Sequence, residues 1–402
     1  MSLKFTIDAT YTLAQKTGIG YFVEGLIAGL KKINSTDDFS LFYNCIFPEK
    51  YGVISPSQNN FKNHILRIPR RFLMNFWNSN WFPNDLFLPK SDVFVCTGLH
   101  LPNNLKSKIV SIIYDVSFKI DDFTYSMREK NQIDSLIKKI LKNSDFIFTC
   151  SESTKTDLIK YYDYPESKIG ILYGSLTEID VNKNNLTLTE EFVCRISEKN
   201  FSETGLKTGF SKNTNYFLFI GAIEKRKNLG IICEALKNRG LDLNGDNFKI
   251  IIAGKKSNDF KDFFQKITDY GLTDKFIFTG YVSEIEKYTL LNNCLGTLYP
   301  SVYEGFGYPV LESFYFSKPV ITTRRGSIPE LAGEAAFYIE PFNPEDLLEK
   351  MTLIYKNKNC LEKIFPSKKF NSQLEKFSWE KSALKFIETI KSKVCSNTIT
   401  ES

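Results

Sequence analysis

The chain has 402 residues, of which 42% are hydrophobic and 24% are charged, and its formal net charge is +6. This length is too great for one hydrophobic core and predicts two domains of ordinary size. The composition is normal for a globular protein. The modest positive charge falls well short of that of a dedicated nucleic-acid binder and suits an anionic small molecule or an anionic membrane surface.

The N-terminal nine residues form a short strand pattern without the apolar segment of a signal peptide, and no apolar run approaches the length of a membrane span. The eight cysteines occur singly, with no spacing typical of a metal site. Cys96, Cys150, Cys233 and Cys294 lie in apolar or helical contexts and look like reduced core thiols. These features predict a cytoplasmic protein.

The first half of the chain alternates strand-like and helix-like segments. Strands are predicted at 4–7, 40–45, 92–96, 109–114 and 146–150, and helices at 20–32, 126–143 and 153–162. Nearly continuous apolar strands that alternate with helices are typical of a parallel sheet covered on both faces. We therefore expect a Rossmann-like first domain over residues 1–205.

The segment 67–82 combines three arginines with a run of aromatic residues. Such a basic and aromatic stretch is able to lie on a lipid surface. Its apolar spacing also fits a helix that packs into the core of the first domain, and this second interpretation is favoured.

Residues 180–215 are polar and lose periodicity, apart from a short predicted helix at 189–197, and indicate the domain junction. A second alternating series follows, with strands predicted at 216–221, 248–253, 276–279, 295–298, 320–323 and 336–339. We assign residues 206–376 to a second doubly wound domain, 377–395 to a C-terminal helical segment and 396–402 to a disordered tail. Two such domains in tandem predict a ligand cleft at the carboxyl ends of their strands.

The most informative segment is 299–312, which sets Glu304 and Glu312 on either side of a glycine-rich bend. Gly305 and Gly307 carry no Cβ, so backbone N–H groups there are able to approach a diphosphate closely. A helix that begins near Pro309 aims its positive end at the same anion. The plainer alternative is a strand, a turn and a helix with solvated glutamates, since two spaced glutamates alone are a weak signal.

A basic turn follows the first predicted strand of the second domain. After Gly221 the chain reaches Arg226 and Lys227, just before a predicted helix. An arginine fork and a lysine point charge are suited to neutralise a departing diphosphate. A solvated basic turn with Asn228 as a helix cap is the alternative, and the neighbouring Glu304 segment favours the functional interpretation.

Two weaker signals lie in the first domain. Gly18 and Gly20 follow the first strand and open a helix, although glycines there also serve a tight turn. Tyr114 ends the predicted strand 109–114 and Asp115 follows it, and an aspartate that caps the next turn is as good an interpretation of Asp115 as a catalytic one.

The segment 299–336, which includes the turn that begins at Gly326, resembles the retaining GT-B-fold glycosyltransferases of family 4, or glycosyl transferases group 1. The resemblance is strong over 216–341 and moderate over 5–174. It implies that Arg226 and Lys227 bind the donor diphosphate and that Glu304 stabilises an oxocarbenium-like centre. The other donor-binding positions that it implies are Gly221, Gly280, Tyr281, Val282, Ser301, Gly305, Phe306, Gly307 and Glu312.

In the first domain the resemblance implies a glycine loop at Gly18 and Gly20 beside the donor phosphate and the acceptor. Many relatives have His-Asp where this chain has Tyr114 and Asp115, so the role of the family histidine is in doubt. The C-terminal segment is expected to cross back onto the first domain. The wording of the motifs is most like that of bacterial surface-polysaccharide mannosyltransferases, which use GDP-mannose and lipid-linked acceptors at the inner face of the membrane.

The chain contains only two histidines, His64 and His100, and no Asp-x-Asp pair that would hold a metal with a diphosphate. Charge neutralisation therefore falls to Arg226, Lys227 and helix ends, and neither a metal nor a cofactor beyond the nucleotide sugar is required. Two alternatives remain open. One is a nucleotide-sugar epimerase or a phosphorylase on the same architecture. The other is a non-catalytic subunit of a polysaccharide assembly complex, which only Tyr114 favours.

Overall fold

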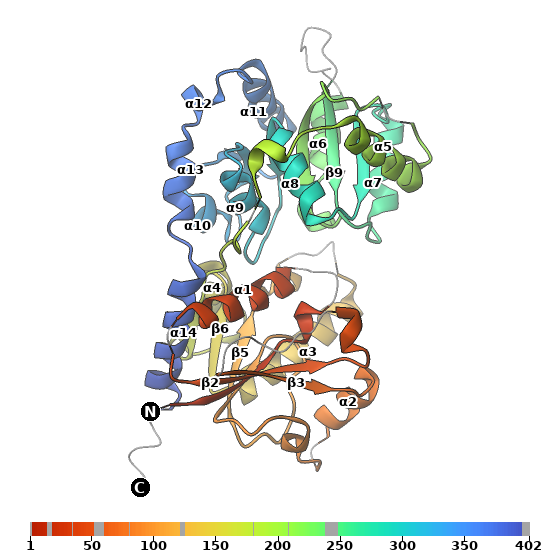
Figure 1. Cartoon of the computed structure of the whole chain (residues 1–402). Helices are drawn as coiled ribbons and strands as arrows, with labels where there is room; N and C mark the ends of the chain where they lie inside the picture. The colour runs from red at the N-terminus through yellow and green to blue at the C-terminus, as the bar shows by residue number, and fades with distance from the viewer. Residues whose placement is uncertain are drawn as a thin grey trace. The chain divides into compact units, whose positions relative to one another are not determined.

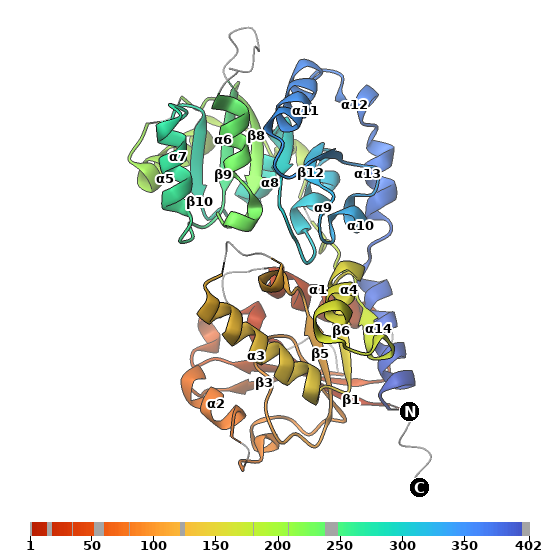
Figure 2. The same cartoon turned by 180° about the vertical axis from the view of Figure 1, so that it is seen from behind.

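The computed structural model describes residues 2–13, 18–33, 35–51, 60–79, 81–120, 125–179, 181–207, 209–237 and 248–395. The chain forms two compact units, shown in Figures 1 and 2, and each is described by itself. Unit 1 comprises Met1–Thr177 with Phe377–Ser402, and unit 2 comprises Glu178–Lys376. The predicted domain boundary was at 205/206, whereas the chain passes into unit 2 at Glu178. The predicted disordered tail, 396–402, lies outside the described residues.

Unit 1 is built on a parallel sheet of seven strands in the order β3-β2-β1-β4-β5-β6-β7. The strands are β1 (Lys4–Asp8), β2 (Asp38–Asn44), β3 (Phe61–Leu66), β4 (Val93–Cys96), β5 (Lys108–Ile113), β6 (Phe146–Thr149) and β7 (Ile169–Ile171). The two edge strands, β3 and β7, were not predicted. An edge strand is less apolar or shorter than a central one, and β3 (Phe-Lys-Asn-His-Ile-Leu) and the three-residue β7 follow this rule.

Helices cover both faces of this sheet (Figures 1 and 2). They are α1 (Gly18–Lys32), α2 (Arg70–Trp77), α3 (Met127–Asn143), α4 (Glu152–Tyr162) and α14 (Trp379–Lys393), with 3-10 turns η1 (Thr10–Thr12), η2 (Pro48–Tyr51), η3 (Asn84–Phe87), η4 (Ser117–Lys119) and η5 (Glu166–Lys168). The start of α3 is fixed by a capping box in which Ser126 and Glu129 satisfy each other's backbone N–H groups.

The C-terminal helix α14 completes the core of unit 1. Gly25 and Gly29 on α1 leave room for Trp379, because a Cβ on either glycine would lie within 2.4 Å of that residue. Phe386 packs against Phe5 of β1 and Phe148 of β6, with ring centroids 6.0 and 5.5 Å apart. Residues more than two hundred positions apart in sequence thus share one apolar layer.

Unit 2 is built on a parallel sheet of six strands in the order β10-β9-β8-β11-β12-β13. The strands are β8 (Asn215–Ile220), β9 (Phe248–Ala253), β10 (Phe276–Gly280), β11 (Gly296–Tyr299), β12 (Val320–Thr323) and β13 (Phe337–Ile339). All six were predicted to within one residue at each end. Their apolar runs are unambiguous because both faces of this sheet are covered.

The helices of unit 2 surround the sheet (Figure 2). They are α5 (Glu190–Thr204), α6 (Gly230–Lys237), α7 (Phe260–Asp269), α8 (Glu284–Asn293), α9 (Tyr308–Tyr315), α10 (Ile328–Ala332), α11 (Pro344–Lys356), α12 (Leu361–Ile364) and α13 (Ser367–Leu374), with turns η6 (Lys183–Asn185) and η7 (Lys225–Lys227). Helix α5 ends seven residues beyond the predicted 189–197 and packs on β10, where the Asn200 side chain accepts a hydrogen bond from Phe278 N at 2.8 Å. This contact explains why 190–204 belongs to unit 2.

Both sheets reverse their strand order at one place, between β1 and β4 in unit 1 and between β8 and β11 in unit 2. Loops that leave neighbouring strands at such a point turn to opposite faces, and the crevice that they open is where doubly wound sheets bind ligands. The loops after β8 and β11 contain Arg226, Lys227 and Glu304. The four cysteines predicted to be core thiols are all buried, and none of the four forms a disulfide.

Candidate active site

A cluster of three charged side chains lies at the switch point of the unit 2 sheet. Strands β8 and β11 are hydrogen-bonded neighbours, and each is followed by one arm of the cluster. After β8 the chain turns at Gly221, whose φ of 146° favours glycine, and enters η7 with Arg226 and Lys227. After β11 it enters the bend that contains Glu304. The sheet topology therefore brings together residues 77 and 78 positions apart in sequence.

Glu304 is buried and accepts hydrogen bonds from both Lys227 and Arg226. Its Oε1 lies 2.5 Å from Lys227 Nζ, and its Oε2 lies 3.0 Å from Arg226 Nη1. Lys227 is buried as well, and its Nζ also donates to the Tyr299 hydroxyl at 3.2 Å. Arg226 Nε makes a second ion pair with Glu224 at 2.8 Å. The sequence predicted the three central residues, but it gave no sign of Tyr299 and Glu224.

Two opposing effects set the protonation of this cluster. Burial alone would raise the pKa of Glu304, but the charges of Lys227 and Arg226 outweigh it and lower the pKa to about 2. Burial lowers the pKa of Lys227, and the charge of Glu304 opposes that shift. Glu304 is thus an ionised carboxylate at neutral pH, suited to accept hydrogen bonds and to stabilise positive charge but not to donate a proton.

The backbone of Glu304 is clamped by the turn before α10. The Glu304 carbonyl accepts from both the N–H and the hydroxyl of Ser327, each at 3.0 Å. Gly326 has a φ of 56°, and a Cβ there would lie 2.5 Å from the Glu304 carbonyl oxygen. The Ser327 hydroxyl also donates to the carbonyl of Phe306. Sequence reasoning noted this turn only as a motif and missed that it holds the bend in place.

The bend leads into the N-terminus of α9, as predicted. Gly307 precedes the helix with a φ of 124° and offers no side chain to cap it. The positive end of the helix dipole and the backbone N–H groups of the first turn therefore make this terminus suited to bind an anion. Phe306 is buried and packs edge-on against Tyr308 with ring centroids 5.0 Å apart, and Gly305 and Ser301 are buried beside it.

Glu312 lies about one turn into α9, as expected, but its carboxylate has a partner that the sequence did not predict. Lys287 of α8 approaches Glu312 Oε1 at 2.5 Å, and both side chains are buried. Burial alone would lower the pKa of Lys287, yet the charge of Glu312 outweighs it and raises that pKa. One oxygen of Glu312 is thus held by Lys287.

Of the three predicted base-contacting residues, Gly280 ends β10 and Tyr281 and Val282 follow it, two strands away from β8. Gly280 has a φ of 60°, and a Cβ there would meet the Glu203 carboxylate of α5 at 2.5 Å. Val282 packs into the core with its side chain. Tyr281 is 48% exposed and its carbonyl accepts from Lys199 Nζ at 3.2 Å, so it is a surface residue and does not pack into the core.

The predicted first-domain positions belong to unit 1. Gly18 and Gly20 lie in the first turn of α1, and Thr17 is outside the described residues. The Asp115 carboxylate accepts from the N–H and the hydroxyl of Ser117 at 2.9 and 2.7 Å, which are the contacts of a turn cap. The Tyr114 ring packs edge-on against Phe22 with ring centroids 5.3 Å apart.

Within the ranges that the structure describes, no group of three or more His, Cys, Asp or Glu side chains has an arrangement that would hold a metal ion. In those same ranges, none of the helices is both long enough and apolar enough to cross a bilayer.

Comparisons with known proteins identify relatives of this chain. Residues 202–368 match the model of the family "Glycosyl transferases group 1". Across 93% of its length the chain is 22% identical to the O-antigen chain mannosyltransferase B of Escherichia coli, 96% of which it covers. It is 26% identical to the O-antigen chain mannosyltransferase RfbU of Salmonella typhimurium over 61% of its length and 60% of that protein's.

Among solved structures, the Anabaena protein HepE in complex with UDP and glucose superposes with a TM-score of 0.60 at 14% identity, over 97% of this chain and 99% of that one. Such a likeness establishes the fold. The family match covers the bend, the basic turn and the clamp described above. The segment 202–368 is therefore identified as a domain of the glycosyl transferases group 1, family 4, and the two parallel-sheet domains of the chain have the GT-B fold.

Proposed function

We propose that this enzyme transfers a sugar from a nucleoside-diphosphate donor to a hydroxyl of a saccharide acceptor and retains the configuration at the anomeric carbon. The observation that carries the proposal is the buried cluster of Glu304, Arg226 and Lys227 at the switch point of the unit 2 sheet. It combines two cations for a diphosphate with one carboxylate for a sugar. The glycine-rich bend and the N-terminus of α9 adjoin it.

The two cations and the helix end receive the diphosphate in this proposal. Arg226 forks onto phosphate oxygens, and Lys227 supplies a point charge. The anomeric C–O bond to the phosphate breaks and a bond from the acceptor oxygen forms on the same face of the sugar. The acceptor's proton passes to the leaving phosphate oxygen, so no histidine is needed. Protein cations neutralise the leaving group, and the proposal requires no metal.

Glu304 has two tasks that follow from its ionised state. It accepts hydrogen bonds from donor-sugar hydroxyls, and its charge stabilises the oxocarbenium-like centre as the leaving group departs. Its low pKa fits both tasks. When a diphosphate binds, Arg226 and Lys227 divide their charge between phosphate and Glu304, so the same three residues hold both halves of the donor.

The remaining donor contacts follow the chain. Glu312, fixed by Lys287, accepts from the ribose hydroxyls, and the backbone and Tyr281 side chain after Gly280 contact the base. The bend residues Ser301, Gly305, Phe306 and Gly307, together with Gly221, shape the diphosphate pocket. From unit 1, Asp115, Tyr114 and the glycines at 18 and 20 contribute to the acceptor side.

GDP-mannose is the proposed donor and a lipid-linked saccharide of surface-polysaccharide synthesis is the proposed acceptor, at the inner face of the cytoplasmic membrane. The names of the two mannosyltransferase relatives support this choice. HepE was solved with UDP and glucose, so UDP-sugars are the competing donors to test.

A thermal-shift panel of GDP, UDP, ADP and dTDP, each without added metal and with its common sugars, tests the donor site. A ligand that binds only the folded state raises the melting temperature, and saturation at about 100 times Kd stabilises the fold by about 2.7 kcal/mol. We expect the largest rise with GDP and GDP-mannose. A rise with UDP alone would replace the proposed donor, and no rise with any nucleotide would contradict the donor site itself.

A further inference from the structure

We propose that a surface of unit 1, centred on α2 and the segment that follows it, docks onto an anionic lipid bilayer. The surface joins an aromatic patch, formed by Phe72, Phe76, Trp81, Phe82 and Phe87, to basic side chains of α2, the 103–106 loop and α3. The inference does not depend on which sugar the enzyme transfers, because it rests on residues outside the donor site.

Helix α2 has two apolar faces that serve different purposes. Leu73 and Trp77, four residues apart, are buried in the core of unit 1 with residues of α3. Phe72 and Phe76, also four residues apart, form a second stripe, and Phe72 is 57% exposed. The core-helix interpretation of 67–82 is thus correct for one face of α2, whereas the other face presents aromatic rings to the solvent.

The aromatic patch continues from α2 into the segment after it. Phe76 lies 4.8 Å from Phe82 and 5.3 Å from Phe87, and these two rings stack at 5.2 Å, measured between centroids. Trp81 packs edge-on against Phe82 and is 82% exposed. A solvent-exposed tryptophan on a mutually supporting aromatic cluster is typical of side chains that enter the interfacial region of a membrane.

Basic side chains flank the patch on two sides. Arg70 and Arg71 begin α2, and Lys139 of α3 donates to the side chain of Asn78, directly after α2, at 3.0 Å. The 103–106 loop touches the same segment, since Asn104 donates to the Phe82 carbonyl at 3.4 Å, and it carries the exposed Lys106. Lys142 lies one turn beyond Lys139 on α3.

Four acidic groups around the patch are already engaged. Glu49 pairs with Arg67 at 2.9 Å, and Asp134 pairs with Lys119 and Lys138 at 2.6 and 2.8 Å. Asp145 pairs with Lys108 at 3.2 Å. Asp85 accepts from the backbone N–H of Lys106 at 3.3 Å. Among the described residues, no ion pair involves Arg71, Lys106 or Lys142, so the surface keeps a net positive charge.

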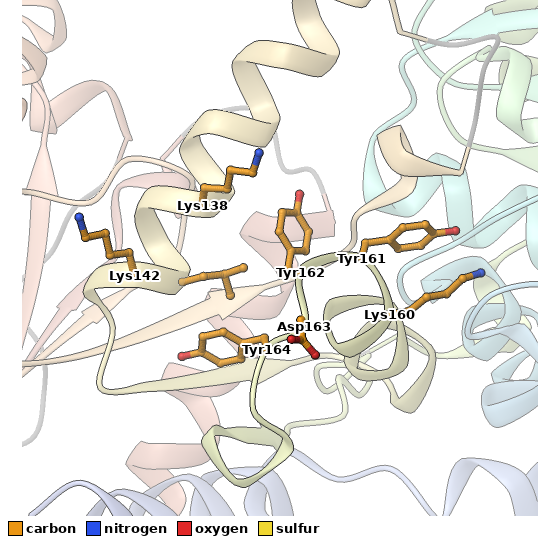
Figure 3. Close-up of a pocket in the computed structure, with 8 residues that line it drawn as sticks. Lys138, Lys142, Lys160, Tyr161, Tyr162, Asp163 and Tyr164 are labelled. Atoms are coloured by element: carbon orange, nitrogen blue, oxygen red, sulfur yellow. The ribbon is translucent and has the colours of Figure 1, made fainter.

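A hollow of about 510 Å³ lies beside this surface, between α3 and residues 160–164 (Figure 3). Lys138 and Lys142 project from α3, whereas Lys160 is directed away from them (Figure 3). The three ammonium groups do not converge on one point, as a site for a single phosphate would require. They spread positive charge over an area, offset in part by Asp134, which pairs with Lys138, and by Asp163, which also lines the hollow. Such a spread suits a layer of anionic headgroups.

The positive charge around the patch also indicates whether a bilayer or a second copy of the chain covers the patch. Two copies meeting through the same patch would bring like charges together, which is unfavourable. An anionic bilayer attracts the basic side chains and offers an apolar layer to Phe72 and Trp81 at once. The structure therefore favours a lipid surface as the occupant.

The experiment mixes the full-length protein with vesicles of phosphatidylcholine, either alone or with about one third phosphatidylglycerol, at low salt. Sedimentation measures binding, and tryptophan emission measures insertion. Of the three tryptophans, Trp77 and Trp379 are 3% and 5% exposed, so a blue shift reports on Trp81. We expect binding and a blue shift with the anionic vesicles, and at least a tenfold loss of binding for the double variant Phe72→Ser, Trp81→Ser.

Matched controls distinguish binding through this surface from nonspecific adsorption to vesicles. Phe342→Ser removes a 75% exposed aromatic side chain in unit 2, and Lys261→Gln with Lys368→Gln removes two exposed charges there. Neither control should change binding, whereas Arg71→Gln with Lys142→Gln should weaken it at least fivefold. Circular dichroism melting checks that each variant is folded.

Three results would overturn the proposal. They are an absence of binding to anionic vesicles by the wild type, an equal loss in the unit 2 controls, and a concentration-dependent blue shift without vesicles. The last result would assign the patch to self-association.

Discussion

The two sheets share a strand order around their switch points, yet the pKa values of the buried carboxylates at those points are shifted in opposite directions. Asp8 ends β1, is buried, and accepts from Thr10 N at 3.1 Å. Burial raises the pKa of Asp8 because its hydrogen bonds to Thr10 and the charge of Arg70 compensate only in part. Glu304 is equally buried, but Lys227 and Arg226 lie within 3.0 Å and lower its pKa to about 2.

The difference shows that the fold provides a place for chemistry and that the side chains decide what is done there. Among the described residues Asp8 has no ion pair, and its contacts are hydrogen bonds such as that from the Thr97 hydroxyl to the Asp8 carbonyl at 2.6 Å. Unit 2 keeps a buried cluster of charges, which is costly to desolvate unless each charge has a partner. A cluster of this kind is expected where it serves a reaction.

The most direct test of this difference between the two carboxylates is to neutralise each one without changing its shape. Glu304→Gln should lower kcat/KM for donor turnover at least ~100-fold, because the stabilising charge in the transition state is lost. Asp8→Asn is the matched control and should lower it less than ~5-fold by the same reasoning. Release of nucleoside diphosphate in the presence of acceptor measures both. Equal losses would mean that the two switch points are not different in function.

The pH dependence of folding stability should also distinguish Glu304 from Asp8. The lowered pKa of Glu304 means that its stabilising contribution is complete above its ordinary pKa of 4.5 and is lost as pH falls towards 2. The raised pKa of Asp8 has the opposite effect on stability, since ionising Asp8 at neutral pH destabilises the folded state. Glu304→Gln should therefore melt several degrees below the wild type at pH 7 and approach it at pH 3.

Under the same conditions Asp8→Asn should melt at or above the wild-type temperature at pH 7. Circular dichroism melting at both pH values checks the pair. A lower melting temperature for Asp8→Asn at pH 7 would show that the Asp8 charge is stabilising, against the physical argument.

A smaller effect is expected from the second buried ion pair. Lys287→Met keeps the volume of the side chain but releases the Glu312 oxygen that Lys287 holds. The Kd for the best-bound nucleoside diphosphate should rise about tenfold, and kcat should change little, because the ribose is bound equally in the ground and transition states. Replacing the nucleotide by its 2′-deoxy form should cost the variant less than the wild type.

Lys212→Met is the matched control for that variant, since it breaks the exposed ion pair between Lys212 and Glu190. Exposed pairs contribute about 0–1 kcal/mol, so neither Kd nor stability should change measurably. An unchanged Kd in Lys287→Met would show that Glu312 does not depend on Lys287.

The smallest expected effect is that of removing the Tyr281 side chain, which is proposed to contact the nucleotide base. Tyr281→Ala should raise the nucleotide Kd only about threefold, because a half-exposed ring loses little contact area. The backbone contacts proposed for this segment remain in the variant. Isothermal titration calorimetry with two nucleotides that differ in base would measure the change, and no change in their ratio would remove Tyr281 from the base-binding group.

Much of the second domain could be predicted from the sequence because its signals are local. The six strands are apolar runs, and the bend with Glu304 follows one of them directly. Arg226, Lys227 and the start of α9 at Tyr308 were placed correctly for the same reason. The roles of these residues remain predictions, whereas their positions are those expected.

The contacts that hold the site together could not be predicted, because they join distant segments. Lys287 and Glu312 are 25 residues apart on two helices, and the Ser327 clamp on Glu304 spans 23 residues. Neither has a local pattern, since a lysine on a helix and a serine in a turn are common. The edge strand β3 was missed for a related reason, because its polar residues break the apolar run.

The packing of α14 on α1 has a consequence for the order in which the protein folds during synthesis. Unit 1 is interrupted by about 200 residues of unit 2, and Trp379 and Phe386 emerge from the ribosome only after these. At about 5–20 residues per second, synthesis of unit 2 takes some 10–40 seconds, and for all of that time the surface around Gly25, Gly29 and Phe5 lacks α14. Unit 2 is therefore free to finish first, and the half-built unit 1 is the species that chaperones would have to protect.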